Sequence, residues 1–86
     1  MPLDFSAHTI ACLTKRDLRE LMHGLFAVSE VQVRRSVASQ IGGRLIVEAE
    51  APDQKSLETF FESRRFNCEW VMRIDLDAQN DNLTEY

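Results

Sequence analysis

Residues 44–53 read Arg-Leu-Ile-Val-Glu-Ala-Glu-Ala-Pro-Asp, and this stretch decides the fold of the chain. Side chains 44–50 alternate between two faces, and such alternation indicates a half-buried β-strand. The inward face comprises Leu45, Val47 and Ala49, and the outward face comprises Arg44, Ile46, Glu48 and Glu50. The strand ends at Ala51-Pro52-Asp53, because proline suits the first turn of a helix and aspartate suits the positive end of its dipole. The stretch therefore predicts a strand that leads directly into a helix.

A second strand and a turn precede this stretch. Three valines alternate with polar residues, which predicts a partner strand whose inward side chains are Val31, Val33 and Val37. The segment Gln40-Ile41-Gly42-Gly43 follows, and glycine takes a positive φ without the steric penalty of other residues, as hairpin turns require. Together, the two strands predict an antiparallel hairpin.

Two amphipathic helices are expected, one before and one after the hairpin in the sequence. The first follows a short strand at residues 8–13 and begins at the capping box Thr14-Lys15-Arg16-Asp17. Its apolar side chains recur at helical spacing, and they are Leu18, Leu21, Met22, Leu25 and Phe26. The second helix begins after Pro52 and ends near Arg64 and Arg65, and its inner stripe comprises Leu57, Phe60 and Phe61.

A last strand is predicted over residues 67–76. Its alternation places one set inward, namely Cys68, Trp70, Met72, Ile74 and Leu76. The other set faces outward, namely Glu69, Val71, Arg73 and Asp75. Residues 1–7 are expected to be a loosely held lead-in, and residues 77–86 a polar, frayed tail. The ordered core is therefore expected over residues 8–76 of a single domain spanning residues 1–86.

The element order is β-α-β-β-α-β, which is typical of the ferredoxin-like fold in the α+β class. Because both helices are amphipathic, we expect a two-layer sandwich with two helices on one face of a four-stranded antiparallel sheet. The other sheet face is expected to be open and mixed in character, with Arg34, Ser36, Ile46, Glu48, Glu69, Val71 and Arg73. So small a domain buries little apolar surface, which favours a homodimer through this face.

Charge and motifs exclude several classes of protein. The chain has 10 basic and 14 acidic residues, and its formal net charge of −4 is the reverse of a nucleic-acid-binding footprint. It contains no apolar run long enough to span a membrane, and Met1-Pro2-Leu3-Asp4 does not look like a signal peptide, so a cytoplasmic protein is expected. Its two cysteines, Cys12 and Cys68, are then expected to be reduced and buried.

Parts of the sequence resemble a family of small ferredoxin-like proteins that includes nickel-responsive, nickel-binding bacterial dimers. The resemblance spans roughly residues 8–76, and its motifs are His8-Thr9, Leu13-Thr14, Gly43 to Asp53 and Val71 to Asp75. The resemblance implies a dimer that binds a divalent metal such as nickel, and it implies that His8 is a ligand of this metal. Val47 stands where the family pattern has a cysteine, and the loop after the first helix is short.

A metal site can also be sought from ligand chemistry. Nickel and similar ions prefer imidazole nitrogen, with carboxylates filling further positions. We therefore expect a metal site formed by His8 on the first strand and by Glu48 and Glu69, which lie on neighbouring strands if the sheet order is 4-1-3-2. A dimer could add ligands from both copies to this site. The alternatives are that His8 is a polar edge residue, and that the glutamates are solvated or pair with Arg34, Arg44 or Arg73.

Two other functions stay open at this point. The first is a non-catalytic regulatory or interaction module that uses the open sheet face for a partner. The second is a cofactor-free isomerase or monooxygenase with the same topology, in which Trp70, Met72 and Phe60 line a pocket. No nucleophile, zinc-protease or phosphate-loop motif occurs in the sequence, which argues against an enzyme.

Overall fold

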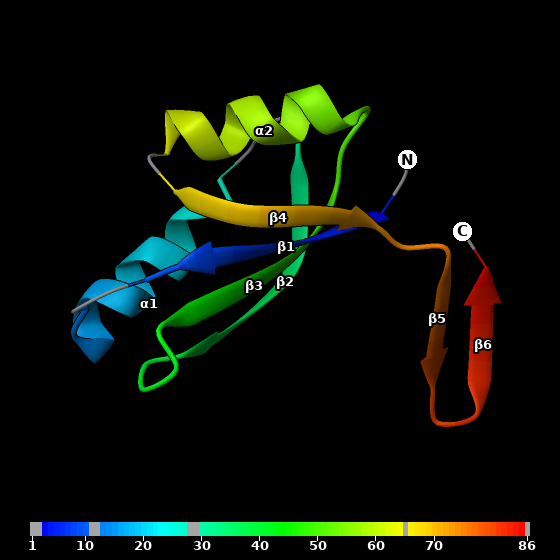
Figure 1. Ribbon diagram of the computed structural model, residues 1–86, viewed down its shortest axis with the longest axis horizontal. Helices are drawn as coiled ribbons and strands as arrows, with labels where there is room; N and C mark the ends of the chain where they lie inside the picture. Colours follow the sequence, from blue (N-terminus) through cyan, green and yellow to red (C-terminus); the bar gives the residue numbers. More distant parts are fainter. Residues whose placement is uncertain (1–2, 11–12, 28–29, 65, 86) are drawn as a thin grey trace.

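The chain forms an α+β structure of two helices and two antiparallel sheets (Figure 1). The computed structural model describes residues 3–10, 13–27, 30–64 and 66–85. The elements are β1 (Leu3–Thr9), α1 (Lys15–Gly24), β2 (Gln32–Ser39), β3 (Arg44–Glu50), α2 (Gln54–Ser63), β4 (Asn67–Arg73), β5 (Leu76–Gln79) and β6 (Asn82–Glu85). The larger sheet has the order β2-β3-β1-β4 with antiparallel neighbours, and β5 pairs with β6.

Both helices begin at the capping residues that the sequence predicts. The Thr14 side chain accepts a hydrogen bond from the Asp17 backbone N–H at 3.1 Å, and α1 starts at the next residue. Asp53 accepts a hydrogen bond from the Ser56 N–H at 2.7 Å and caps α2 in the same way. Each cap satisfies a backbone donor that the helix itself leaves unpaired, so these contacts fix where the helices start.

One apolar core joins the two helices to the same face of the larger sheet. Leu45, Val47 and Ala49 of β3 are buried in it, as their alternation predicts. From α2, the core receives Leu57, Phe60 and Phe61, and from α1 it receives the partly buried Leu18, Leu21 and Met22. Burial of each large apolar side chain contributes about 1.5–3 kcal/mol, so this shared core holds the two layers together.

The first strand begins and ends earlier than the sequence predicts: the prediction was residues 8–13, whereas β1 ends at Thr9 and residues 10 and 13 are outside any strand. Residues 11 and 12 lie outside the described residues. Instead of a loose lead-in, residues 3–9 form β1, which pairs with both β3 and β4. The prediction was wrong because β1 turns polar side chains, Asp4, Ser6 and His8, toward the helices. This pattern hides the alternation that marks a half-buried strand.

The predicted phase of the last strand is also wrong. Trp70 and Met72 are 41% and 52% exposed, whereas Val71 packs against the core. The reason is a register shift in β1–β4 pairing, where Ala7 pairs with Trp70 but His8 pairs with Cys68. The extra residue, Glu69, reverses which side chains face the helices, because side chains alternate with a period of two.

Further expected core residues lie outside the core. Val37 and Phe26 are exposed, although Val31 is buried and Val33 is partly buried, as predicted. A second register shift, between Val33 and Arg35 in β2, places Val37 on the opposite side of the sheet from Val33. Phe26 follows the end of α1, so the helical periodicity no longer applies to it.

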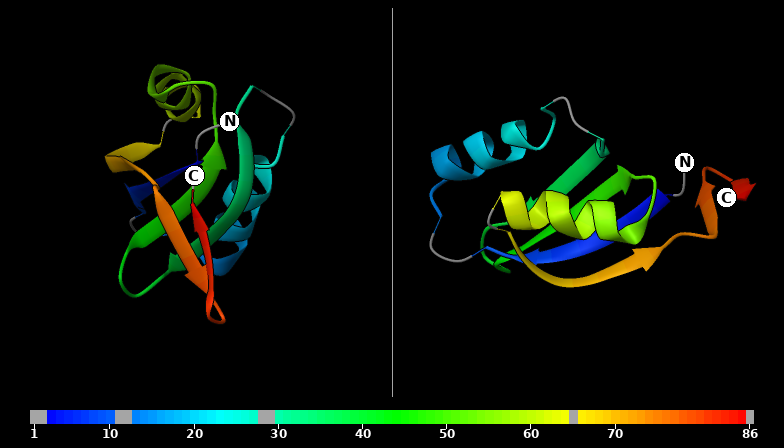
Figure 2. Two further views of the ribbon diagram at one scale, coloured as in Figure 1. Left: turned by 90° about the vertical axis from the view of Figure 1, so that its right-hand side faces the viewer. Right: turned by 90° about the horizontal axis from the view of Figure 1, so that it is seen from above.

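Residues 76–85 form a β-hairpin instead of the predicted frayed tail. Its strands β5 and β6 are joined at Asn80 and Asp81, whose φ angles are 50° and 67°. Hairpins with two-residue loops favour positive φ at both turn positions, and asparagine and aspartate tolerate it better than most residues. Figures 1 and 2 show that this hairpin projects beyond the end of the four-stranded sheet.

Candidate functional site

The side of the larger sheet away from the helices, called the open face below, carries a continuous apolar row. Strand pairing aligns Val37 with Ile46, Ile46 with Ala7, and Ala7 with Trp70, so the row crosses all four strands. A second row, aligned in the same way, comprises Arg35, Glu48, Phe5 and Met72. Most of this surface is not apparent from the sequence, because two register shifts reverse the expected phase of β2 and β4.

A shallow hollow lies within these two rows. Its volume is about 170 Å³, and its lining is formed by Phe5, Arg35, Val37, Ile46 and Glu48. Three of these side chains are apolar, while one cation and one carboxylate stand beside them. The hollow can therefore accept an apolar side chain and offer a charged contact next to it.

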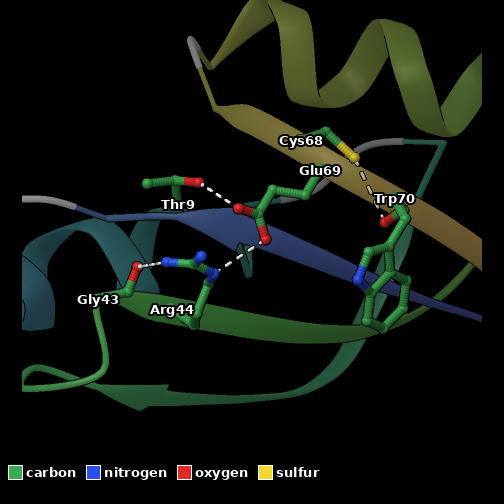
Figure 3. Close-up of polar contacts among 6 residues, drawn as sticks. All are labelled: Thr9, Gly43, Arg44, Cys68, Glu69 and Trp70. Atoms are coloured by element: carbon green, nitrogen blue, oxygen red, sulfur yellow. Dashed lines mark hydrogen bonds and ion pairs between the residues drawn. The ribbon is translucent and has the colours of Figure 1, made fainter.

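The Glu69 carboxylate links three strands at one end of the open face (Figure 3). Its Oε1 accepts a hydrogen bond from the Thr9 hydroxyl at 2.8 Å, and its Oε2 lies 2.9 Å from Nε of Arg44. Arg44 also donates to the Gly43 carbonyl oxygen at 3.3 Å. Glu69 thus ties β4 to β1 and β3 at the point where the β1–β4 register shifts.

His8 lies on the other side of the sheet, within the core. Its ring is fully buried, its Nε2 lies 2.7 Å from the Ser6 hydroxyl oxygen, and its centroid is 4.2 Å from that of Phe61. Its Nδ1 has no hydrogen-bond partner among the described residues. Burial lowers the pKa of His8 to about 4, although the Glu69 carboxylate opposes this shift. The imidazole is therefore neutral at neutral pH.

The structure brings two of the three expected metal ligands to one face. Glu48 and Glu69 are on the open face, whereas His8 is directed toward α2 and is separated from them by the sheet. Glu69 pairs with Arg44, which is one of the alternatives that the sequence left open. Within residues 3–10, 13–27, 30–64 and 66–85, no three histidine, cysteine or acidic side chains are grouped as metal ligands.

Other expected site features are also placed differently. Cys68 is an exposed free thiol, not a buried one, and it donates to the Trp70 carbonyl oxygen at 3.5 Å. Partial burial and nearby carboxylates raise the pKa of this thiol, so it is protonated at neutral pH. Cys12 lies outside the described residues. Trp70 and Met72 lie on the open face while Phe60 lies in the core, so these three do not line one pocket.

Comparison with known proteins identifies a similar structure but no family. No protein-family model and no curated protein matches this sequence. The structure is similar to the crystal structure of SCO4226 from Streptomyces coelicolor A3(2), with a TM-score of 0.77 and 16% sequence identity. The similarity covers 88% of this chain and 99% of that chain. At this identity, the similarity establishes a shared fold.

The helices of the described part of the chain are too short and too polar to cross a lipid bilayer. On the open face of the sheet, large apolar side chains and charges of both signs lie together.

Proposed function

We propose that this chain is a non-catalytic interaction module with a ferredoxin-like fold, and that its open face binds a second copy of the chain. The strand order β2-β3-β1-β4, with a helix after β1 and another after β3, supports the ferredoxin-like assignment. The observation that carries the functional proposal is the apolar row across all four strands, from Val37 to Trp70. The ends of the row, Val37 and Trp70, are 45% and 41% exposed, and large apolar side chains exposed on one face mark an interaction site in soluble proteins.

A second copy is the favoured partner because the charges of the open face complement one another. Arg35 and Glu48 are paired neighbours on adjacent strands, and both line the hollow. In a two-fold interface, the same surface meets itself, so Arg35 of one copy can pair with Glu48 of the other and the reverse. An 86-residue chain also buries a small fraction of its surface alone, so covering the row would stabilise both copies.

Sedimentation of a Val37→Asp variant tests the dimer. The wild-type chain should sediment at twice its monomer mass, and Val37→Asp should sediment as a monomer because a charge would be buried in the interface. Ile41→Asp is the matched control: Ile41 is a fully exposed apolar residue in the β2–β3 turn, away from the apolar row. A monomeric wild type, or a Val37→Asp chain that stays dimeric, would contradict the proposal.

Divalent-metal binding is the second candidate function, with nickel as the ion that the resemblance implies. It is favoured by the position of Glu48, whose carboxylate makes no hydrogen bond or ion pair with the described residues and would face the second copy. His8, Glu48 and Glu69 do not fit one metal site within a single chain, because the sheet separates His8 from the carboxylates. A metal site on the open face would therefore use carboxylates from two copies.

A further inference from the structure

The strand β2 forms one edge of the larger sheet, called the β2 edge below. The sheet order is β2-β3-β1-β4, so β2 pairs with β3 on one side, and no described strand pairs with its other side. An antiparallel edge strand directs the backbone N–H and C=O groups of every second residue outward, where an added strand can pair with them. After the register shift between Val33 and Arg35, the pairing of β2 with β3 is regular as far as Ser39. This edge can therefore accept an extended peptide of about five residues.

A groove follows the β2 edge on the helix side of the sheet. Its volume is about 280 Å³, and it is lined by Arg19, Met22, His23, Phe26 and Ser36. Ser36 of β2 pairs with Val47, which is buried in the core, so Ser36 faces the helices. Figure 2 shows that α1 lies beside β2. The helix-facing side chains of a strand added to the β2 edge would therefore enter this groove.

The apolar side chains of the groove are incompletely covered in the single chain. No residue of α1 is buried, whereas α2 buries Leu57, Phe60 and Phe61. Met22 is partly buried against the core, and Phe26 is 54% exposed. An apolar side chain on an added strand would fill the groove and remove both of these side chains from water.

The charges at the β2 edge favour an acidic partner. The described residues that line the groove include the cation Arg19 and no carboxylate, and Arg19 makes no ion pair with the described residues. The strand β2 adds Arg34 and Arg35 and contains no carboxylate, although Arg34 pairs with Glu50 at 3.5 Å. Residues 15–39 carry five basic and three acidic residues in a chain whose net charge is −4. This part of the chain therefore attracts an acidic segment.

We infer that the β2 edge binds an extended segment of a partner protein in which an acidic and an apolar residue stand two positions apart. Side chains two positions apart share a face of a strand, so the apolar one enters the groove while the carboxylate pairs with Arg19. The backbone of the segment continues the sheet beyond β2. Two β2 edges in antiparallel pairing would bring Arg34 and Arg35 of both copies together, which disfavours a second copy here. The β2 edge is separate from the open face, so this inference does not depend on the proposed dimer.

A synthetic peptide tests this inference with the full-length, ¹⁵N-labelled chain. The probe is Thr-Glu-Thr-Leu-Thr-Glu-Thr with blocked ends, which places its leucine and both glutamates on one face of a strand. In an NMR titration, this peptide should shift the amide signals of residues 32–39. A peptide with lysine in place of both glutamates, and one with proline in place of the two threonines beside leucine, should each bind at least about tenfold more weakly, because the first reverses the charge and the second removes backbone donors.

Matched variants of the chain locate the contact. Arg19→Gln should weaken binding of the acidic peptide by about threefold to fivefold, as expected for loss of a partly exposed ion pair. Arg16→Gln removes the same charge from an exposed position of α1 outside the groove and should leave the Kd unchanged. Phe26→Ser should weaken binding by about tenfold, whereas Ile41→Ser, at a fully exposed position in the β2–β3 turn, should not. Far-UV circular dichroism should confirm that all four variants are folded.

Three results would overturn the inference. The first is the absence of binding at millimolar concentrations of the acidic peptide. The second is equal binding of the lysine peptide, or equal weakening by Arg16→Gln and Arg19→Gln, because the groove would then not read the charge of its partner. The third is a set of shifted amide signals that lies in β1 or β4 instead of residues 32–39, which would place the peptide on another surface.

Discussion

Ser6 and His8 stand two residues apart on β1 and share a hydrogen bond inside the core, with 2.7 Å between the hydroxyl oxygen and Nε2. Both side chains are buried, and the imidazole packs against the rings of Phe61 and Phe66. The ring thus fills space as an aromatic residue while it keeps one polar contact. This role differs from the metal ligand that the sequence suggested for His8.

Stability should fall as the pH drops from about 6.5 to about 4. The folded pKa of His8 is about 4 and its ordinary value is 6.5, so in this range the unfolded chain binds a proton that the folded chain does not. The full effect below pH 4 is about 3 kcal/mol at about 1.4 kcal/mol per pH unit. Urea unfolding at several pH values measures it.

Two variants isolate the His8 contribution to this pH dependence. Burial raises the pKa of Asp4, which opposes the trend because the folded chain binds that proton more strongly. Both wild type and His8→Gln contain Asp4, so its effect cancels in the difference between their free energies of unfolding. This difference should shrink as the pH falls. His23→Gln, on exposed α1 surface, should reproduce the wild-type profile. A pH profile of His8→Gln parallel to that of wild type would rule out His8 as the cause.

Ser6→Ala should destabilise the chain by about 1–3 kcal/mol, because the buried Nε2 of His8 would lose its hydrogen-bond partner. Thr59→Ala, at an exposed position of α2, should change the free energy of unfolding by less than about 0.5 kcal/mol. Urea unfolding at pH 7 compares the two. Equal effects at both positions would mean that the Ser6–His8 contact contributes nothing measurable.

Parts of this structure follow from local sequence, and parts depend on pairing between strands. The caps at Thr14 and Asp53 and the phase of β3 were predictable, because each depends on residues close together in the chain. The exposure of Trp70 was not predictable, since the register shift next to Glu69 arises from pairing with β1, sixty residues away. For the same reason the positions of Val37 and Trp70 in the site were missed, whereas Ile46 and Glu48 were expected on the open face and lie there.

Divalent metals should raise the melting temperature if the second candidate function is right. An ion at about 100 times its Kd adds roughly 2.7 kcal/mol, which corresponds to a rise of roughly 10–20 °C for a domain of this size. Melts with Ni²⁺, Co²⁺ and Zn²⁺ measure this rise, which Glu48→Gln should abolish. Glu62→Gln, an exposed carboxylate on α2, is the control. An equal rise in wild type and Glu48→Gln would exclude Glu48 as a ligand.

Trp70 provides an optical test of the open face, because it is the single tryptophan of the chain. It stands at the β4 end of the apolar row and is 41% exposed in the isolated chain. Dimerisation through this face would remove the indole from water, so its emission should shift to shorter wavelength as protein concentration rises. Acrylamide quenching of its fluorescence should fall over the same concentration range.

Val37→Asp tests whether this optical change reports the dimer. Val37 lies at the β2 end of the same row, three strands away from Trp70, so the substitution does not alter the immediate surroundings of the indole. In this variant, both emission and quenching should stay constant at every concentration. Ile41→Asp should retain the wild-type concentration dependence. A wild-type emission maximum that does not move while sedimentation reports a dimer would place the interface on another surface, because the row cannot be covered without shielding Trp70.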